Sequence, residues 1–282
     1  MEKASITHIH MNTIHTFPLH SHLFSQFSSS CNLSFSLHHS HTTFLRLRPS
    51  GRRLPSLNCA NPEAAGSKLG AVDSSLAVKK QAADVSPELK GTSIFLVGMP
   101  SSLKTSLGKM LADTLRYYYF DSDSLVEEAV GGASAAKSLR EKDETTLYES
   151  ETEVLKQLSS MGRLVVCAGN GAVQSSTNLA LLRHGISLWI DVPLDIMARD
   201  VSEASSSGSY PEVTDQLAAL YNKYRDGYAT ADAIISVQKV ASRLGCDNFD
   251  DITTEEMTLE ALKEIQKLTR VKKMLEEAAR PF

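Results

Sequence analysis

The chain has 282 residues, of which 42% are apolar and 22% are charged, and its formal net charge is -4. These values are ordinary for a protein with a sizeable folded core. The acidic balance and the lack of nucleic-acid-binding motifs argue against a nucleic-acid partner. No apolar run approaches the roughly 18 residues that a membrane-spanning helix needs, so we expect no integral membrane segment. The four cysteines lack metal-type spacing, which favours a reducing compartment.

The N-terminal segment has a composition typical of an organelle transit peptide. Between Lys3 and Pro62 there is no Asp or Glu, whereas Ser, Thr and Phe are frequent and arginines cluster near its end. The segment also lacks the compact apolar stretch of a secretory signal. We therefore predict a chloroplast transit peptide over residues 1–60 and a location in the plastid stroma. A tail without a targeting function is the alternative.

The next segment predicts a linker, and the rest predicts a folded domain. Residues 61–90 are rich in Ala, Ser and Gly and show no sustained period, so we predict a disordered linker there. From residue 91 onward, strand-like runs alternate with helical patterns, which predicts an α/β domain with a parallel sheet and helices on both faces. The predicted strands are 93–97, 117–120, 164–168, 186–191 and 233–237. The predicted helices are 104–115, 144–159, 175–183, 193–204 and 212–224.

The C-terminal segment predicts a long amphipathic helix. From Thr254 onward, apolar side chains recur at helical spacing and charged residues occupy the remaining positions. We expect this helix to pack on the domain 91–282. A helix that docks a partner is the alternative.

One segment has most of the features of a phosphate-binding loop. The run from Gly98 to Thr105 reads Gly-Met-Pro-Ser-Ser-Leu-Lys-Thr, between a predicted strand and a predicted helix. In G-x-x-x-x-G-K-[ST] loops the lysine reaches the outer phosphates and the hydroxyl binds Mg²⁺. Gly98, Lys104 and Thr105 are therefore the candidate nucleotide-binding residues, and an ordinary first helical turn is the alternative. Leu103 stands where the pattern has glycine, so its branched side chain would crowd the phosphates.

Two carboxylates and a glycine turn follow two further predicted strands. Asp121 and Asp123 come directly after the second strand. One carboxylate near Mg²⁺ and one near an acceptor hydroxyl would suit phosphoryl transfer. Asp121 is therefore the second candidate Mg²⁺ ligand, unless the pair only caps the next helix. Gly169 and Gly171 follow the third strand, where they would let a substrate approach the backbone or simply start the next helix.

These motifs, in this order and spacing, resemble shikimate kinase, the small P-loop kinase that phosphorylates the 3-hydroxyl of shikimate with MgATP. The resemblance covers residues 91 to about 237, and residues 144–151 and 188–194 add to it. It implies a P-loop kinase-like, five-stranded parallel sheet with a mobile lid and a helical shikimate-binding segment. The positions that it relates to the shikimate site are Asp123, Tyr148, Gly169, Gly171 and Arg225.

The chain departs from the family on the nucleotide side. The family's phosphate loop has glycine at the places held here by Ser101 and Leu103. Its lid carries an arginine for the transferring phosphate, whereas no Arg or Lys occurs here from Asp200 to Glu212. An arginine in that role is worth roughly 10³–10⁵ in rate.

The chain also departs from the family on the acceptor side. The family motif E-x-x-F-R-x-x-E supplies an arginine for the shikimate carboxylate, and Tyr148 holds its place. The family's triple-glycine turn is interrupted by Asn170. A second carboxylate-binding arginine is replaced by Tyr224, and Arg225 is displaced by one residue. Since a hydrogen bond to a charged group contributes roughly 1.5–3 kcal/mol, these losses would lower affinity for shikimate about 10²–10⁴-fold.

The departures favour a plastid protein of the shikimate kinase type that has lost catalysis, with Asp123 as a vestige of the site. The resemblance to plant relatives of this kind implies a role in chloroplast biogenesis or development, through binding an unidentified plastid protein. No cofactor would be required, and MgATP would be an optional ligand. The alternative is a small-molecule kinase with an acceptor other than shikimate, since Tyr148 suits an uncharged or aromatic acceptor.

Overall fold

The computed structural model describes residues 66–204, 210–246 and 248–280, so the predicted transit peptide lies outside the described residues. Five parallel strands form one sheet in the order β2-β3-β1-β4-β5. The strands are β1 (Ile94–Val97), β2 (Tyr118–Asp121), β3 (Leu164–Cys167), β4 (Ile186–Asp191) and β5 (Ala233–Ser236). This confirms the predicted five-stranded parallel sheet, and each strand boundary lies within one residue of the prediction.

The sheet is buried at its centre because both of its faces are covered. Every residue of β1 and β3 is buried, as expected for central parallel strands without a solvent-facing side. The edge strand β2 differs, since Tyr118 is exposed. Parallel strands end at the same edge, so the segments that follow β1, β2 and β3 come together there.

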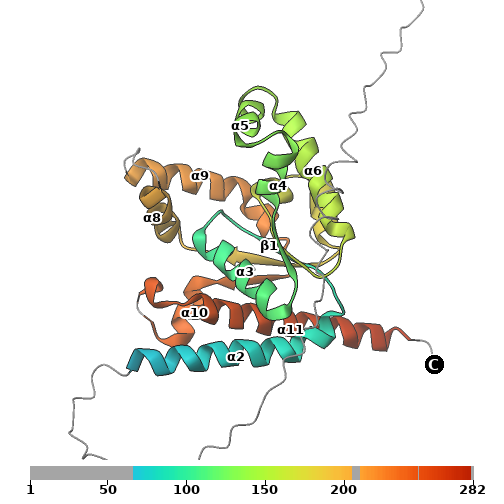
Figure 1. Ribbon diagram of the computed structural model, residues 1–282, viewed down its shortest axis with the longest axis vertical. Helices are drawn as coiled ribbons and strands as arrows, with labels where there is room; N and C mark the ends of the chain where they lie inside the picture. Colours follow the sequence, from blue (N-terminus) through green and yellow to red (C-terminus); the bar gives the residue numbers. More distant parts are fainter. Residues whose placement is uncertain (1–65, 205–209, 247, 281–282) are drawn as a thin grey trace, which may run out of the picture. The chain divides into compact units, whose positions relative to one another are not determined.

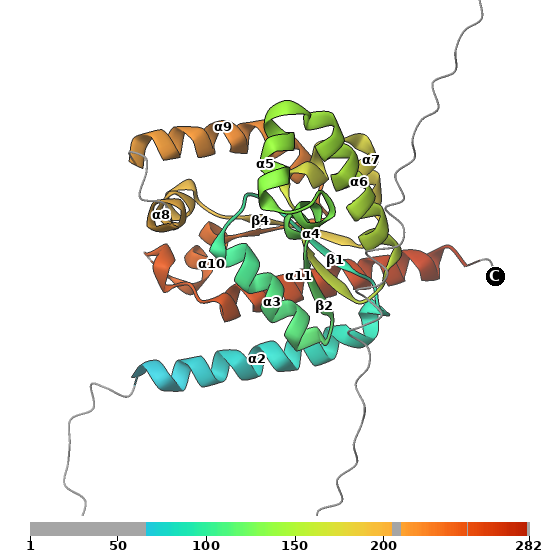
Figure 2. The same ribbon diagram turned by 45° about the horizontal axis from the view of Figure 1, so that its top comes forward.

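The helices lie in layers on the two faces of this sheet. Figure 1 and Figure 2 place α3 and α11 on one face, with α2 beyond them, and α6 and α7 toward the other. The predicted helices are present, and the structure adds three short ones, α4, α5 and α10, that the sequence patterns did not predict. In the described residues the helices are α2 (Gly66–Leu89), α3 (Ser102–Leu115), α4 (Ser122–Ala129), α5 (Ala133–Lys142), α6 (Glu144–Ser160), α7 (Ser176–Leu182), α8 (Leu194–Ala204), α9 (Tyr210–Tyr228), α10 (Val237–Leu244) and α11 (Thr254–Ala278), with 3-10 turns at Asn170–Val173 and Phe249–Asp251.

The prediction of a disordered linker over residues 61–90 is wrong for α2. Val78, Ala82, Val85 and Leu89 recur at intervals of three or four residues and are each at most 3% exposed, so one stripe of this helix is part of the core. A hydrogen bond between Gln81 Nε2 and Oε1 of Gln266 on α11 spans 3.0 Å. The folded unit therefore begins before residue 91.

The C-terminal helix α11 starts with a capping box, in which Thr253 and Glu256 satisfy each other's backbone N–H groups. Its first half is buried against the domain, as expected for an amphipathic helix, and Ile265 is fully covered. Farther along, Val271 is 49% exposed and Leu275 is 66% exposed. In the part of the chain that the structure describes, no helix is long and apolar enough to cross a bilayer.

Candidate functional site

The phosphate loop begins with a turn that only glycine can make. Gly98 has φ 128°, and a Cβ there would meet the carbonyl oxygen of Ile190. The loop ends at the N-terminus of α3, where the Ser101 hydroxyl accepts a hydrogen bond from the Lys104 backbone N–H at 3.2 Å. The Lys104 backbone N–H, a first-turn donor that could face a phosphate, is therefore already bonded to the protein's own Ser101 side chain.

Lys104 is turned onto the backbone around the loop. Its side chain is buried, and Nζ donates to the carbonyl oxygens of Gly98 at 2.8 Å and Ala168 at 3.0 Å. Burial lowers the pKa of this ammonium, whereas the nearby carboxylates of Asp123 and Asp121 raise it. The lysine thus joins the phosphate loop to the segment that follows β3.

An acidic side chain sits at the start of α3. The carboxylate of Asp200, from α8, accepts hydrogen bonds from the Ser102 backbone N–H at 3.0 Å and from the Ser102 hydroxyl at 2.6 Å. A helix N-terminus favours an anion because its N–H groups are unpaired and its dipole is positive there. Asp200 therefore supplies an anion at this helix N-terminus from within the protein. The sequence analysis did not identify Asp200 or Ser102, because no local motif joins them.

Leu103 has a helical backbone within α3, a conformation that any L-residue adopts. Its side chain is partly buried against the core. The predicted crowding of a phosphate by Leu103 stays a prediction. Thr105 hydrogen-bonds through Oγ1 to the carbonyl oxygen of Ser101 at 3.3 Å, as a helical threonine does.

The residues for a nucleotide are present in the loop, but their donors point to protein oxygens. MgATP would have to displace Asp200 from Ser102 and draw Lys104 away from two carbonyl groups. Among the described residues, no group of three or more His, Cys, Asp or Glu side chains is placed to hold a metal ion. In this arrangement the Ser102 and Lys104 donors of the loop are bonded within the protein.

The two aspartates at the end of β2 and the start of α4 have different surroundings. Asp121 caps α4, since Oδ1 accepts from the Ser124 backbone N–H at 3.1 Å. Asp123 lies against the turn after β3, where a Cβ at Gly169 would overlap its carboxylate. Although Asp123 keeps access to solvent, desolvation by the surrounding protein raises the pKa of its carboxyl, and Lys104 opposes that shift.

A second carboxylate, Glu151 on α6, faces the same turn. A Cβ at Gly171 would overlap it, so glycine is required there by close approach. Oε2 of Glu151 is buried without a hydrogen-bond partner. Burial, with a smaller contribution from Asp123, raises the pKa of Glu151 to about 7, and Arg140 opposes this shift. Glu151 belongs to the family-like segment 144–151, but the sequence pattern alone did not indicate a role for it.

Tyr148 is engaged by two polar neighbours. Its hydroxyl hydrogen-bonds to the Glu144 carboxylate, one helical turn earlier on α6. It also accepts from Nε2 of Gln174 at 2.7 Å. A phenol in this position binds an acidic side chain of the protein itself and offers no positive charge to a ligand.

Aromatic side chains from α9 close the next part of the site. The Tyr228 ring is fully buried 5.9 Å from Trp189 and 6.3 Å from Tyr224, between ring centroids. The Tyr228 hydroxyl donates to Oδ1 of Asn170 at 2.7 Å. Burial raises the pKa of Tyr228, so it remains a neutral donor. Asn170, which interrupts the glycine turn, thus has a structural partner.

The predicted site residues fall into one connected group and one outlier. Lys104, Asp123 and the turn at Gly169 are joined by hydrogen bonds and charge interactions. Arg225 is exposed on α9, and its charge acts on Tyr221, whose pKa is raised chiefly by burial. The predicted carboxylate-binding role of Arg225 stays a prediction.

Comparison with known proteins gives one family. The shikimate kinase family model matches residues 100–266. An Arabidopsis thaliana protein named "Probable inactive shikimate kinase like 1, chloroplastic" is 58% identical over 233 residues, which cover 82% of this chain and 83% of that protein. "Shikimate kinase 3, chloroplastic" of Oryza sativa subsp. japonica is 38% identical over 213 residues, covering 72% and 74%.

The crystal structure of shikimate kinase from Bacteroides thetaiotaomicron has the same fold. It aligns with a TM-score of 0.52 at 23% identity, over 62% of this chain and 98% of that one. The chloroplastic names of the plant relatives agree with the chloroplast location expected from the N-terminal composition. The phosphate loop, the carboxylates beside the glycine turn and these matches converge, and the chain belongs to the shikimate kinase family.

Proposed function

We propose that this chain is a catalytically inactive shikimate kinase-like protein of the chloroplast stroma, which acts in chloroplast biogenesis by binding a partner protein. One observation carries the loss of catalysis: Tyr148 and Tyr224 stand where the family resemblance places arginines for the shikimate carboxylate. A phenol is neutral at physiological pH and cannot replace a bidentate guanidinium. A bound anionic acceptor would thus lack the guanidinium groups that hold its carboxylate.

The electrostatics around Glu151 support this proposal. Its carboxylate is partly buried with one oxygen unpartnered, and its pKa is raised to about 7. A neighbouring guanidinium would lower that pKa instead. The arginine that would balance Glu151 is thus missing as a close partner, and Arg140 acts on it only as a weaker opposing charge.

The nucleotide side supports the same conclusion. Asp200 bonds to Ser102 where a phosphate group would bind, and Leu103 adds bulk beside it. The Arabidopsis relative whose name reads "Probable inactive shikimate kinase like 1" is 58% identical to this chain. The role in biogenesis rests on the resemblance to plant members. Its partner would bind at the former cleft or at the exposed apolar residues of α11, such as Met274 and Leu275.

The proposal is tested by titrating the full chain with MgATP and with shikimate in a calorimeter, and by assaying shikimate-dependent ADP release. We expect no shikimate-dependent turnover and no measurable heat with shikimate. A plant shikimate kinase assayed in parallel controls for the reagents. Turnover at a normal kinase rate would overturn the proposal.

A second function, a kinase for another acceptor, is favoured by one specific observation. Lys223 lies over the Tyr224 ring, 5.1 Å from its centroid, and its charge acts on Tyr148 and Glu144. With Arg140, it leaves some positive charge near the former acceptor site. ATP hydrolysis stimulated by a hydroxyl compound other than shikimate would favour this function over the first.

A further inference from the structure

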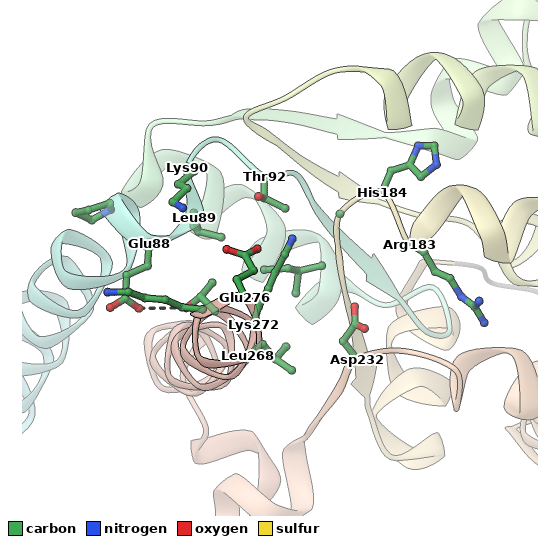
Figure 3. Close-up of a pocket in the computed structure, with 15 residues that line it drawn as sticks. Glu88, Leu89, Lys90, Thr92, Arg183, His184, Asp232, Leu268, Lys272 and Glu276 are labelled. Atoms are coloured by element: carbon green, nitrogen blue, oxygen red, sulfur yellow. Dashed lines mark hydrogen bonds between the residues drawn. The ribbon is translucent and has the colours of Figure 1, made fainter. Parts of the chain in front are cut away.

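A cavity lies at the opposite edge of the sheet from the phosphate loop. Its volume is about 530 Å³, within the range of small-molecule sites. Its walls are the end of α2, the residues before β1 and β4, Asp232 before β5, and the second half of α11. Figure 3 shows Lys272 and Glu276 on α11, with Lys90 and Arg183 on opposite sides of the gap.

Much of this cavity is built by segments outside the match to the family model, which spans residues 100–266. Glu88, Leu89 and Lys90 come from the end of α2, and Leu268 and Lys272 come from α11. Leu89, the last residue of α2, is buried in the core beside the cavity. The cavity is therefore separate from the site where the family's phosphoryl transfer takes place.

Positive side chains line the cavity without partners. Within the described ranges, none of its four cations forms an ion pair or a side-chain hydrogen bond; they are Lys90, Arg183, Lys272 and Lys273. Two of the three acidic residues accept hydrogen bonds from neutral hydroxyl groups and keep their negative charge. Asp232 accepts from the Ser187 hydroxyl at 2.8 Å, and Glu88 accepts from the Thr269 hydroxyl at 3.1 Å.

The remaining acid, Glu276, stands one helical turn from Lys272. The cavity therefore carries four positive side chains against three carboxylates, a formal charge of +1, with Leu268 as an apolar part of its wall. Unpaired cations around a concavity attract a ligand with several negative groups, because each can receive charge-assisted hydrogen bonds. We propose that this cavity binds a small organic polyanion, a phosphate ester or a polycarboxylate, held mainly by Lys272 and Arg183.

The test is calorimetric titration of the full chain with citrate and, separately, with pyrophosphate. The two probes distinguish a carboxylate ligand from a phosphate ligand, and saturable binding of either supports the proposal. The double variant Lys272→Gln, Arg183→Gln should weaken binding roughly tenfold or more for each cation removed. Binding should also weaken as the salt concentration rises. Absence of binding by the unmodified chain at millimolar probe overturns the proposal.

The phosphate loop is a competing anion site, so Lys104→Gln serves as a second variant. If the Lys104→Gln chain still binds the probe, the result supports the cavity as the binding site. If binding is lost only in the Lys104→Gln chain, the proposal is overturned. Lys267→Gln is the matched control, because Lys267 lies on the same helix but pairs with Glu264. Glu276→Gln should tighten binding, since it removes a negative charge, and weaker binding there counts against the proposal. Circular dichroism confirms that each variant is folded.

Discussion

The charged side chains at the two edges of the sheet differ in whether they bond to other protein groups. At the carboxyl edge, Lys104 donates to two backbone carbonyl groups and Ser102 donates to Asp200. At the amino edge, Lys272 and Arg183 line a cavity without ion pairs in the described residues. The family's reaction belongs to the first edge, where the phosphate-loop lysine is bonded to backbone oxygens, whereas Lys272 and Arg183 form no bond of that kind among the described residues at the second. Polar groups that bond to each other are not free to bind a ligand.

The amino edge depends on α2, so the largest expected effect comes from breaking its packing. Leu89 is 1% exposed in the core between α2 and the domain. Leu89→Ala should lower the free energy of unfolding by about 2–5 kcal/mol, because it removes buried methyl groups and leaves a cavity. Urea denaturation followed by circular dichroism measures this change.

Leu76→Ala is the control for that experiment. Leu76 is on the same helix but 60% exposed, so its substitution should change stability by less than about 0.5 kcal/mol. Equal, small effects of both substitutions would mean that α2 is not packed on the domain, and the walls of the cavity would then be lost.

The carboxyl edge is tested by returning an arginine to it. Tyr148→Arg should improve shikimate binding roughly 10–100-fold over the unmodified chain, since one charged hydrogen bond contributes about 1.5–3 kcal/mol. Calorimetry or saturation-transfer NMR detects the gain. Tyr148→Phe, which removes the hydroxyl without adding charge, should bring no gain. If the arginine also brings none, lack of charge at residue 148 is not what excludes shikimate.

The nucleotide end of the same edge gives a smaller effect. Asp200→Ala frees the Ser102 backbone N–H and removes a negative charge from the start of α3. MgATP binding should strengthen about tenfold, and Leu103→Gly in the same chain should add to it by making space for a phosphate. Asp195→Ala is the matched control, because Asp195 lies on α8 and is exposed. Equal effects of the two aspartate substitutions would contradict a specific role for Asp200.

Sequence patterns predicted the sheet well because its strands are short apolar runs, such as residues 186–191. The interpretation of Tyr148 as the replacement of an arginine depends on the surrounding motif, and it stays a prediction. The patterns missed α2, since its Ala and Ser content hid the spacing of Val78 and Val85. They could not predict the contact of Ser102 with Asp200, which are 98 residues apart and joined only by the fold.

The smallest expected effect is a pH dependence at Glu151. Folding raises its pKa from 4.5 to about 7, mainly through burial, with Asp123 and Glu144 adding to the shift and Arg140 opposing it. Between these two values the folded chain binds more protons than the unfolded chain, so the free energy of unfolding falls as pH rises through this window. Glu151→Gln removes this fall in the free energy of unfolding, because glutamine does not titrate. Because the side chain is only half-buried, solvent screening limits the effect to the order of 1 kcal/mol.

The measurement compares the thermal unfolding of both chains at pH 5 and pH 8. The gain in stability from Glu151→Gln should be larger at pH 8, where the unmodified carboxylate is charged in a partly buried position near Asp123 and Arg140 offsets this only in part. Glu153→Gln, on the same helix but paired with Lys156 at the surface, should show no such difference. A gain that is equal at both pH values would mean that Glu151 is not a strained carboxylate. The Glu151 carboxylate on α6 would then be as well compensated by its surroundings as the Lys104 ammonium is by its two carbonyl partners.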